Sequence, residues 1–236
     1  RREVLDRPVV SMTVWRGGHD APARTYASER ERWFDAEAAA ARAAAQVKNT
    51  VYCGDALPGV MPNLGPEVFN AFLGMELEFG PATSWSVPNL HDWRGIDAIR
   101  FDRANPYWRK MEELTGALLE AGKGLFYVGL TDFHPGGDAC AAFRDPQQFN
   151  IDLIESPQDV KHLMRVVNDC YAEVFATSRK RLEAAGQACC GSMCVDPQRN
   201  TDHCGGCGAT CAPDHATPAC VSGACTAQPN TCLELS

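Results

Sequence analysis

Apolar residues before position 186 fall into short continuous runs that alternate with longer stretches at helical spacing. Runs rich in β-branched and aromatic residues predict strands, and apolar positions three and four residues apart predict amphipathic helices. The expected strands cover residues 8–15, 50–53, 75–79, 83–87 and 125–130. The expected helices cover residues 27–47, 65–73, 105–121 and 156–185. Strands and helices therefore alternate along most of this part of the chain.

The last of these helices carries the clearest signal. Ser156 and Pro157 match a helix start, and Gly186 matches a helix stop. Asn105 and Pro106 give the preceding helix the same kind of start. Between residues 156 and 186, apolar residues form one stripe: Val160, Leu163, Met164, Val167, Tyr171, Val174, Phe175 and Leu182.

Alternating strands and helices are typical of βαβ units, which build parallel sheets. A parallel strand is buried on both faces, and residues 125–130 form an almost wholly apolar run of this kind. No Gly-rich dinucleotide fingerprint and no phosphate-binding loop follows an expected strand. The pattern therefore favours an α/β fold that is part of a (β/α)8 TIM barrel over a nucleotide-binding open sheet.

Composition changes sharply near Gly186. All twenty aromatic residues precede it, and nine of the twelve cysteines follow it. The large apolar residues beyond it are only Met193, Val195, Val221, Leu233 and Leu235. So few cannot build a core, and such a segment needs disulfides or a metal to fold. The sequence thus predicts a barrel portion at residues 1–186 and a Cys-rich module at residues 187–236.

Charge narrows the range of partners. The formal net charge is −8, and the one basic triplet, Arg179 to Arg181, lies on an expected helix. A nucleic-acid partner is therefore not expected. No apolar run approaches the roughly 20 residues that a membrane span needs, so no membrane span is expected either. A small-molecule substrate is the partner expected for the barrel portion.

Two expected strands end in polar clusters, which is where a barrel builds its site. Asp55 follows the strand at residues 50–53, as a turn residue or as a carboxylate facing the barrel mouth. Thr131, Asp132, His134 and Asp138 follow the strand at residues 125–130. Asp132 and His134 could exchange a proton or hold a metal. In the alternative reading, Asp132 or Asp138 caps a short helix and His134 is solvated.

Other residues give weaker signals. Arg16 could meet an acidic substrate at the barrel mouth or could be a surface arginine. The remaining candidates are interpreted as core residues rather than pocket or reactive groups: Trp85, Trp93, Trp108, Cys53, Cys140 and Cys170.

Longer motifs resemble a known family. Residues 49–58 (NTVYCGDALP), 62–66 (PNLGP) and 72–76 (FLGME) are similar to the uroporphyrinogen decarboxylase family, and most to its uncharacterised bacterial branch. The similarity covers most of residues 1–186 in order and continues through residues 83–85, 128–132, 136–138 and 142–144.

This resemblance implies a TIM barrel and a lyase that removes acetate carboxyls from a tetrapyrrole without a cofactor. The family also includes methyltransferases that serve corrinoid proteins, often with zinc. Asp55 matches the family's aspartate that accepts hydrogen bonds from pyrrole N–H groups. The family's Arg-rich loop is matched only loosely by residues 15–19, and its His-x-Cys zinc pattern is absent from the sequence. Its barrel is longer than 186 residues, so we expect a truncated barrel, of doubtful activity by itself.

The tail contains Cys189, Cys190, Cys194, Cys204, Cys207, Cys211, Cys220, Cys225 and Cys232. This density indicates a disulfide framework of unknown connectivity, with one thiol left over. A zinc site at Cys190, Cys194, Cys204 and Cys207 is the alternative, and unstructured thiols are a third. Residues 194–196, 202–208, 211 and 220–225 resemble stigma-specific Cys-rich modules and short repeats of bacterial surface proteins.

The two parts suggest different functions. The barrel portion suggests a cytoplasmic lyase or methyltransferase with a tetrapyrrole or corrinoid-protein partner and no cofactor unless zinc is present. The tail suggests a non-catalytic exported or surface protein that binds through its Cys-rich module. The N-terminal residues carry no apolar signal segment, which counts against export. A fusion of unrelated segments, without activity of its own, is the third hypothesis.

Overall fold

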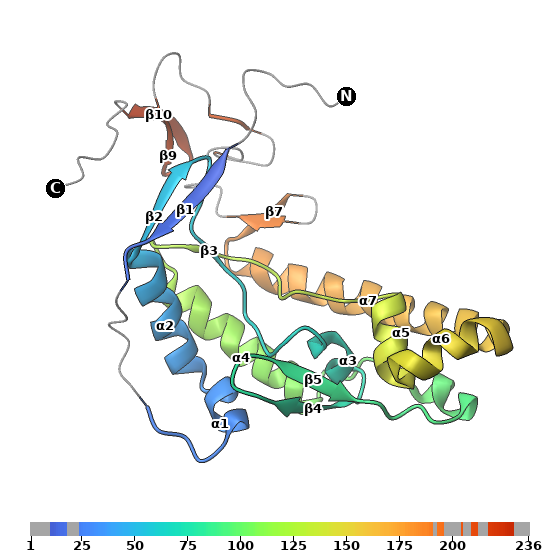
Figure 1. Cartoon of the computed structure of the whole chain (residues 1–236). Coiled ribbons are helices and arrows are strands. Elements are labelled where there is room, and N and C mark those ends of the chain that lie inside the picture. Colours follow the sequence, from blue (N-terminus) through green and yellow to red (C-terminus); the bar gives the residue numbers. More distant parts are fainter. Residues whose placement is uncertain are drawn as a thin grey trace.

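The computed structural model describes residues 10–17, 24–190, 193–195, 204, 209–211 and 217–228. Figure 1 shows the helices gathered in one body, with a two-stranded arm and the tail strands at one end. The helices are α1 Glu29–Phe34, α2 Ala36–Lys48, α3 Val68–Phe72, α4 Pro106–Ala121, α5 Gly137–Arg144, α6 Pro146–Glu155 and α7 Pro157–Ala184, with a 3-10 helix η1 at Trp93–Ala98. The strands are β1 Ser11–Trp15, β2 Thr50–Gly54, β3 Gly59–Val60, β4 Glu76–Phe79, β5 Ser84–Val87, β6 Tyr127–Val128, β7 Ala188–Cys190, β8 Met193–Val195, β9 Thr217–Val221 and β10 Ala224–Gln228.

The best-marked helices begin where their caps predict. The Asn105 side chain accepts hydrogen bonds from the backbone N–H groups of Tyr107 and Trp108, with Pro106 in the first turn of α4. The long helix α7 begins at Pro157, and Gly186 lies just beyond its end at a φ of 82°. Such a positive φ favours glycine, which confirms the predicted helix stop.

The sequence pattern predicts one helix over residues 27–47, and the structure has two. Asp35 ends α1 and caps α2, because its carboxylate accepts a hydrogen bond from Ala38 N at 2.9 Å. Arg24 and Tyr26 donate to the same carboxylate at 2.7 and 3.0 Å. The Ala38 bond, with help from Arg24 and Tyr26, lowers the pKa of the Asp35 carboxyl. Because a short acidic side chain can accept hydrogen bonds from nearby backbone N–H groups, Asp35 favours a new helix start over one continuous helix.

The main core lies where α3, α4, α5 and α7 meet. Its aromatic rings pack edge to face, as rings prefer: the Phe72 and Trp108 centroids are 5.1 Å apart, and those of Phe69 and Tyr171 are 5.9 Å apart. A second core joins α2, α4 and β6 to the end of α7. The apolar stripe of α7 contributes buried residues to both cores, as its spacing predicted.

The strands of the described residues form five two-stranded sheets, and none of these sheets closes. Only β3 and β6 pair in parallel. The expected parallel arrangement is wrong for β1 with β2, which pair antiparallel, and β4 and β5 also pair antiparallel. The partial (β/α)8 barrel therefore stays a prediction.

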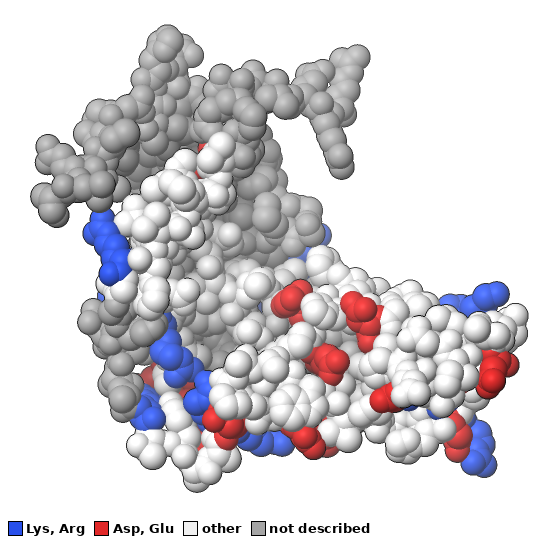
Figure 2. Space-filling view, in the orientation of Figure 1, with Lys and Arg blue, Asp and Glu red and all other residues white. Residues whose placement is uncertain are grey.

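The first strand differs most from expectation. It was expected at residues 8–15 as a buried strand, but β1 begins at Ser11 and all five of its residues are exposed. Residues 8 and 9 lie outside the described residues. Figure 2 shows the arm formed by β1 and β2 as a largely uncharged surface. The apolar pattern identified the strand correctly, but the expected burial is wrong.

The first tail strands lie against the body. β7 and β8 pair antiparallel and contact α7, and β8 also contacts β6. The Gln187 side chain accepts a hydrogen bond from Val128 N at 3.4 Å. The packed body therefore continues beyond Gly186, where the composition changes.

Among the helices of the described residues, none combines the length and the hydropathy that a transmembrane span needs.

A buried ion pair ties α5 to α6. Arg144 Nε donates to Asp152 Oδ2 at 2.7 Å, and the two side chains are only 7% and 5% exposed. Gln148 also donates to Asp152, while Arg144 donates to Leu90 O and lies over the Trp93 ring at 4.3 Å. Burial alone would raise the pKa of Asp152, but the hydrogen bonds from Arg144 and Gln148 outweigh it and lower that pKa. The pair therefore stabilises the fold while Asp152 is ionised.

We expect Asp152→Asn to lower the free energy of unfolding at pH 7 by about 3 kcal/mol, because it leaves Arg144 buried without a counter-charge. The folded-state pKa of Asp152 lies below its unfolded value. Its contribution is therefore present above the unfolded pKa of about 3.9 and is lost as pH falls through the folded pKa. Urea unfolding followed by tryptophan fluorescence at pH 7 and pH 3 should show the difference shrinking in acid.

Glu183→Gln is the control, because it removes an exposed ion pair with Arg179. An exposed pair contributes little to stability. Equal losses of stability in the two variants would contradict the role assigned to the buried pair.

Candidate functional site

The parallel pair of β3 and β6 sets the position of the candidate site. Tyr127 N donates to Pro58 O at 3.1 Å, and Gly129 N donates to Val60 O at 2.9 Å. Parallel strands end at the same edge, so the segments that follow β3 and β6 emerge side by side. This brings Asn63 and Asp132, which lie far apart in the sequence, to one cleft.

The cleft has a volume of about 550 Å³ and lies between α2, β2, β3 and the segments that follow β3 and β6. Its walls mix apolar side chains with amides and one carboxylate, among them Trp33, Val60, Met61, Gln46, Asn63 and Asp132. A second hollow of about 310 Å³ shares part of this wall and adds Arg32 and Arg42. A volume of this order is within the range of small-molecule sites, although such sites usually have more apolar walls.

Asp132 and His134 form the one ionisable pair found at this edge of the described structure. His134 Nε2 lies 3.0 Å from Asp132 Oδ2, and the side chains are 37% and 65% exposed. Phe133, between them, points into the core and packs against Phe69 and Tyr171. Because the Phe133 ring anchors the loop, the two polar side chains stay together at the surface. The two side chains are therefore in contact, while a catalytic role for them stays a prediction.

Asp55 lies elsewhere. Its backbone N–H donates to Val10 O at 2.7 Å, and its carboxylate accepts from Val10 N at 2.8 Å. It therefore closes the end of the β1–β2 pair and is not among the residues that line the two hollows. The structure does not bring Asp55 together with Asp132 and His134 in one cleft.

The remaining predicted site residues are spread over the body. Arg16 is exposed beyond the end of β1, and its backbone N–H donates to Asn49 O. Thr131 is buried and lines a narrow pocket beside Trp108. Asp138 is exposed in the first turn of α5. The N-cap of that helix is Gly136, so the alternative in which Asp132 or Asp138 caps it is wrong.

Sequence reasoning missed most of the cleft wall. Trp33, Gln46, Tyr52 and Asn63 line it, and burial raises the pKa of the Tyr52 hydroxyl. Asn63 follows β3 closely, but the sequence pattern predicts no strand at residues 59–60, so its strand-end position gave no signal. The α2 residues carried none, since their role depends on how the helix packs.

The expected core residues are only partly in the core. Trp108 and Cys140 are buried, and burial raises the pKa of the Cys140 thiol to about 12. Cys53, Cys170 and Trp93 are half-buried. Trp85 is 46% exposed, because it lies on the outer face of β5 and donates to Glu78. The prediction of a core role for Trp85 is wrong.

In the tail, two disulfides join described residues: Cys204 to Cys220 and Cys211 to Cys225. The disulfide character expected from cysteine density is thus shown for these four. Cys204 is one of the four thiolates of the zinc alternative, and its sulfur is committed to a disulfide here. Cys207 and Cys232 lie outside the described residues. Within the described ranges, no group of three or more His, Cys, Asp or Glu side chains could hold a metal ion.

Comparison with known proteins adds no match: no protein-family model, no curated protein and no solved structure matches this chain. The interpretation of the cleft therefore depends on its own geometry.

The β3–β6 pairing predicts the effect of one substitution. A Cβ atom at residue 59 would lie 2.3 Å from Tyr127 Cζ, so Gly59→Ala must displace the Tyr127 ring. We expect a loss of about 1 to 3 kcal/mol in the free energy of unfolding. Adding Tyr127→Ala, which removes the ring, should make the Gly59→Ala change nearly neutral in a double-mutant cycle measured by urea unfolding.

Gly137→Ala is the matched control, since a Cβ there meets no atom within 4 Å. Additive effects of Gly59→Ala and Tyr127→Ala would show that the close approach of the ring does not constrain residue 59.

Proposed function

We propose that the body of this chain binds a small-molecule substrate in the 550 Å³ cleft and transfers a proton to it through Asp132 and His134, in the manner of a uroporphyrinogen decarboxylase-like lyase. The observation that carries this proposal is the position of the pair. Asp132 lines the cleft at the carboxyl end of a parallel strand, and His134 is in hydrogen-bond contact with it.

The chemistry of the pair suits a decarboxylation. Loss of carbon dioxide leaves an electron pair on carbon, and that carbon must then take up a proton. Histidine gains and loses a proton close to neutral pH, which makes it a common general acid. Asp132 holds His134 through Nε2, which would leave Nδ1 to donate the proton. His134 is not among the residues that line the cleft, so in this proposal it acts from the rim beside Asp132. Asp132 would position the ring that donates the proton.

The cleft walls suit a ligand with an apolar body and polar edges. Trp33, Val60 and Met61 offer apolar contact, and Gln46 and Asn63 offer amide groups. The Asp132 carboxylate can also accept hydrogen bonds from N–H groups of a ligand. In this proposal Asp132 takes the role that family resemblance assigns to Asp55.

The test is a decarboxylation assay with uroporphyrinogen, in which the products are separated after oxidation to porphyrins. We expect wild-type protein to remove carboxyl groups and His134→Gln to be slower by about a hundredfold or more, because the proton donor is lost. The decarboxylation rate of Asp132→Asn should lie between those of wild type and His134→Gln. Asp138→Asn is the control, since Asp138 lies in the same part of the chain but outside the cleft.

A second arm of the experiment offers methylcorrinoid and a thiol acceptor. Methyl transfer that depends on His134, without decarboxylation, would select the methyltransferase branch of the proposal. Wild-type protein that binds neither tetrapyrrole nor corrinoid, or a His134→Gln variant as active as wild type, would contradict the proposal.

A second candidate function is suggested by the two tail disulfides: an exported or surface protein that binds a partner through its Cys-rich module. Structural disulfides are maintained in oxidising compartments. In protein isolated and denatured without reductant, we expect alkylation to leave Cys204, Cys211, Cys220 and Cys225 unlabelled, as shown by intact mass and peptide mapping. Labelling of all twelve cysteines would remove the basis for this candidate.

A further inference from the structure

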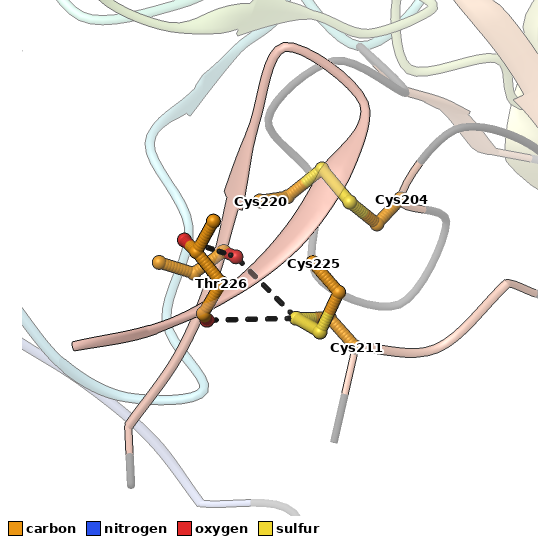
Figure 3. The surroundings of a disulfide bond; sticks show 6 residues. Cys204, Cys211, Cys220, Cys225 and Thr226 are labelled. Atoms are coloured by element: carbon orange, nitrogen blue, oxygen red, sulfur yellow. Dashed lines mark hydrogen bonds between the residues drawn. A yellow bond between two sulfur atoms is a disulfide. The ribbon is translucent and has the colours of Figure 1, made fainter. Parts of the chain in front are cut away.

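The two tail disulfides hold one hairpin in an interleaved pattern. Along the chain, the first and third of Cys204, Cys211, Cys220 and Cys225 are bonded, and so are the second and fourth. Cys220 on β9 and Cys225 on β10 are direct cross-strand partners. Directly opposite side chains lie on the same face of a hairpin. Both disulfides therefore meet the hairpin on one face, as Figure 3 shows.

The two disulfides differ in their access to solvent. Cys204 and Cys220 are 8% and 7% exposed, so both residues of the first bond are buried. In the second bond Cys211 is only 2% exposed, whereas Cys225 is exposed. Thiol–disulfide exchange requires a thiolate to reach one sulfur of the bond, and access is one of the factors that set its rate. Only the second bond offers an exposed residue for attack.

We propose that the Cys211–Cys225 disulfide is a reversible redox site, which an external dithiol opens at Cys225 while the Cys204–Cys220 disulfide stays closed. This proposal is independent of the function assigned to the cleft.

The reaction has two steps. A thiolate of the dithiol attacks Cys225 Sγ, forms a mixed disulfide and expels the Cys211 thiolate, which takes up a proton. The second thiolate of the reagent then attacks the reagent sulfur that is bonded to Cys225 in the mixed disulfide. This step expels the Cys225 thiolate, which is protonated in turn. One protein disulfide is reduced by two electrons, and the dithiol is oxidised to a cyclic disulfide.

The hairpin already provides acceptors for the thiol that is released. Ala219 O lies 3.3 Å and Thr226 O lies 3.8 Å from Cys211 Sγ. These two backbone carbonyls belong to β9 and β10, and Figure 3 shows both contacts. A Cys211 thiol could donate its hydrogen to either oxygen without leaving its place. The reduced state is therefore compatible with an intact hairpin, which the Cys204–Cys220 bond still tethers.

The experiment is a timed reduction of the native, full-length chain with dithiothreitol. Samples are quenched in acid, alkylated with one isotopic form of N-ethylmaleimide, fully reduced and alkylated with a second form. Peptic peptides then report each cysteine separately by mass. We expect Cys211 and Cys225 to become reducible at least about tenfold faster than Cys204 and Cys220, because access limits the attack.

Urea-unfolded wild-type protein is the control. Unfolding removes the difference in access, so the two bonds should then open at similar rates. Equal native rates, faster opening of the Cys204–Cys220 bond, or early labelling of Cys204 through rearrangement to a Cys220–Cys225 bond would each overturn the proposal.

Discussion

The Tyr127 ring lies so close to Gly59 that any side chain at residue 59 would have to displace it, and β3 and β6 pair over two residues each at this point. The pairing is short, yet it decides where two long segments begin. The segment after β3 leads to Asn63 and the segment after β6 leads to Asp132, and both reach the same cleft. If β6 were displaced along β3, Asp132 would leave the wall that α2 completes. The candidate site thus depends on the parallel pairing of β3 with β6, and both strands pack against the second core.

Features that depend on neighbouring residues in the sequence were predictable. The N-cap at Asn105, the proline at Pro157 and the stripe of α7 act within a few turns of helix, so the pattern identifies α4 and α7 closely. Pairing partners were not predictable in the same way. β1 is separated from β2 by two helices, and nothing in the alternation of strands and helices says that these strands run antiparallel. The break between α1 and α2 at Asp35 was harder to predict. The cap is a local interaction, but the residues around it favour one continuous helix.

The candidate site also combines features that neighbouring residues determine with features that depend on distant segments. Asp132 and His134 are two residues apart and follow one strand, so the sequence suffices to bring them together. Asp55 gave the same strand-end signal, but its strand pairs with β1 and its carboxylate is used to bind Val10. A strand end predicts a site residue only when the strand belongs to the parallel set, and a single sequence does not state which strands do. The α2 side of the cleft is wholly a product of packing.

The body and the tail depend on different sources of stability. The body has two apolar cores, and Cys53, Cys140 and Cys170 within it are free thiols. Its folding therefore does not depend on an oxidising environment. The hairpin of β9 and β10 has little apolar surface to bury and is held by crosslinks, which limit the disorder of its unfolded chain. A change in redox conditions would consequently act on the tail and leave the cleft intact, because no described disulfide joins the two. The disulfides of the described residues both lie in the tail, so the tail is the part whose covalent structure depends on the redox conditions around it.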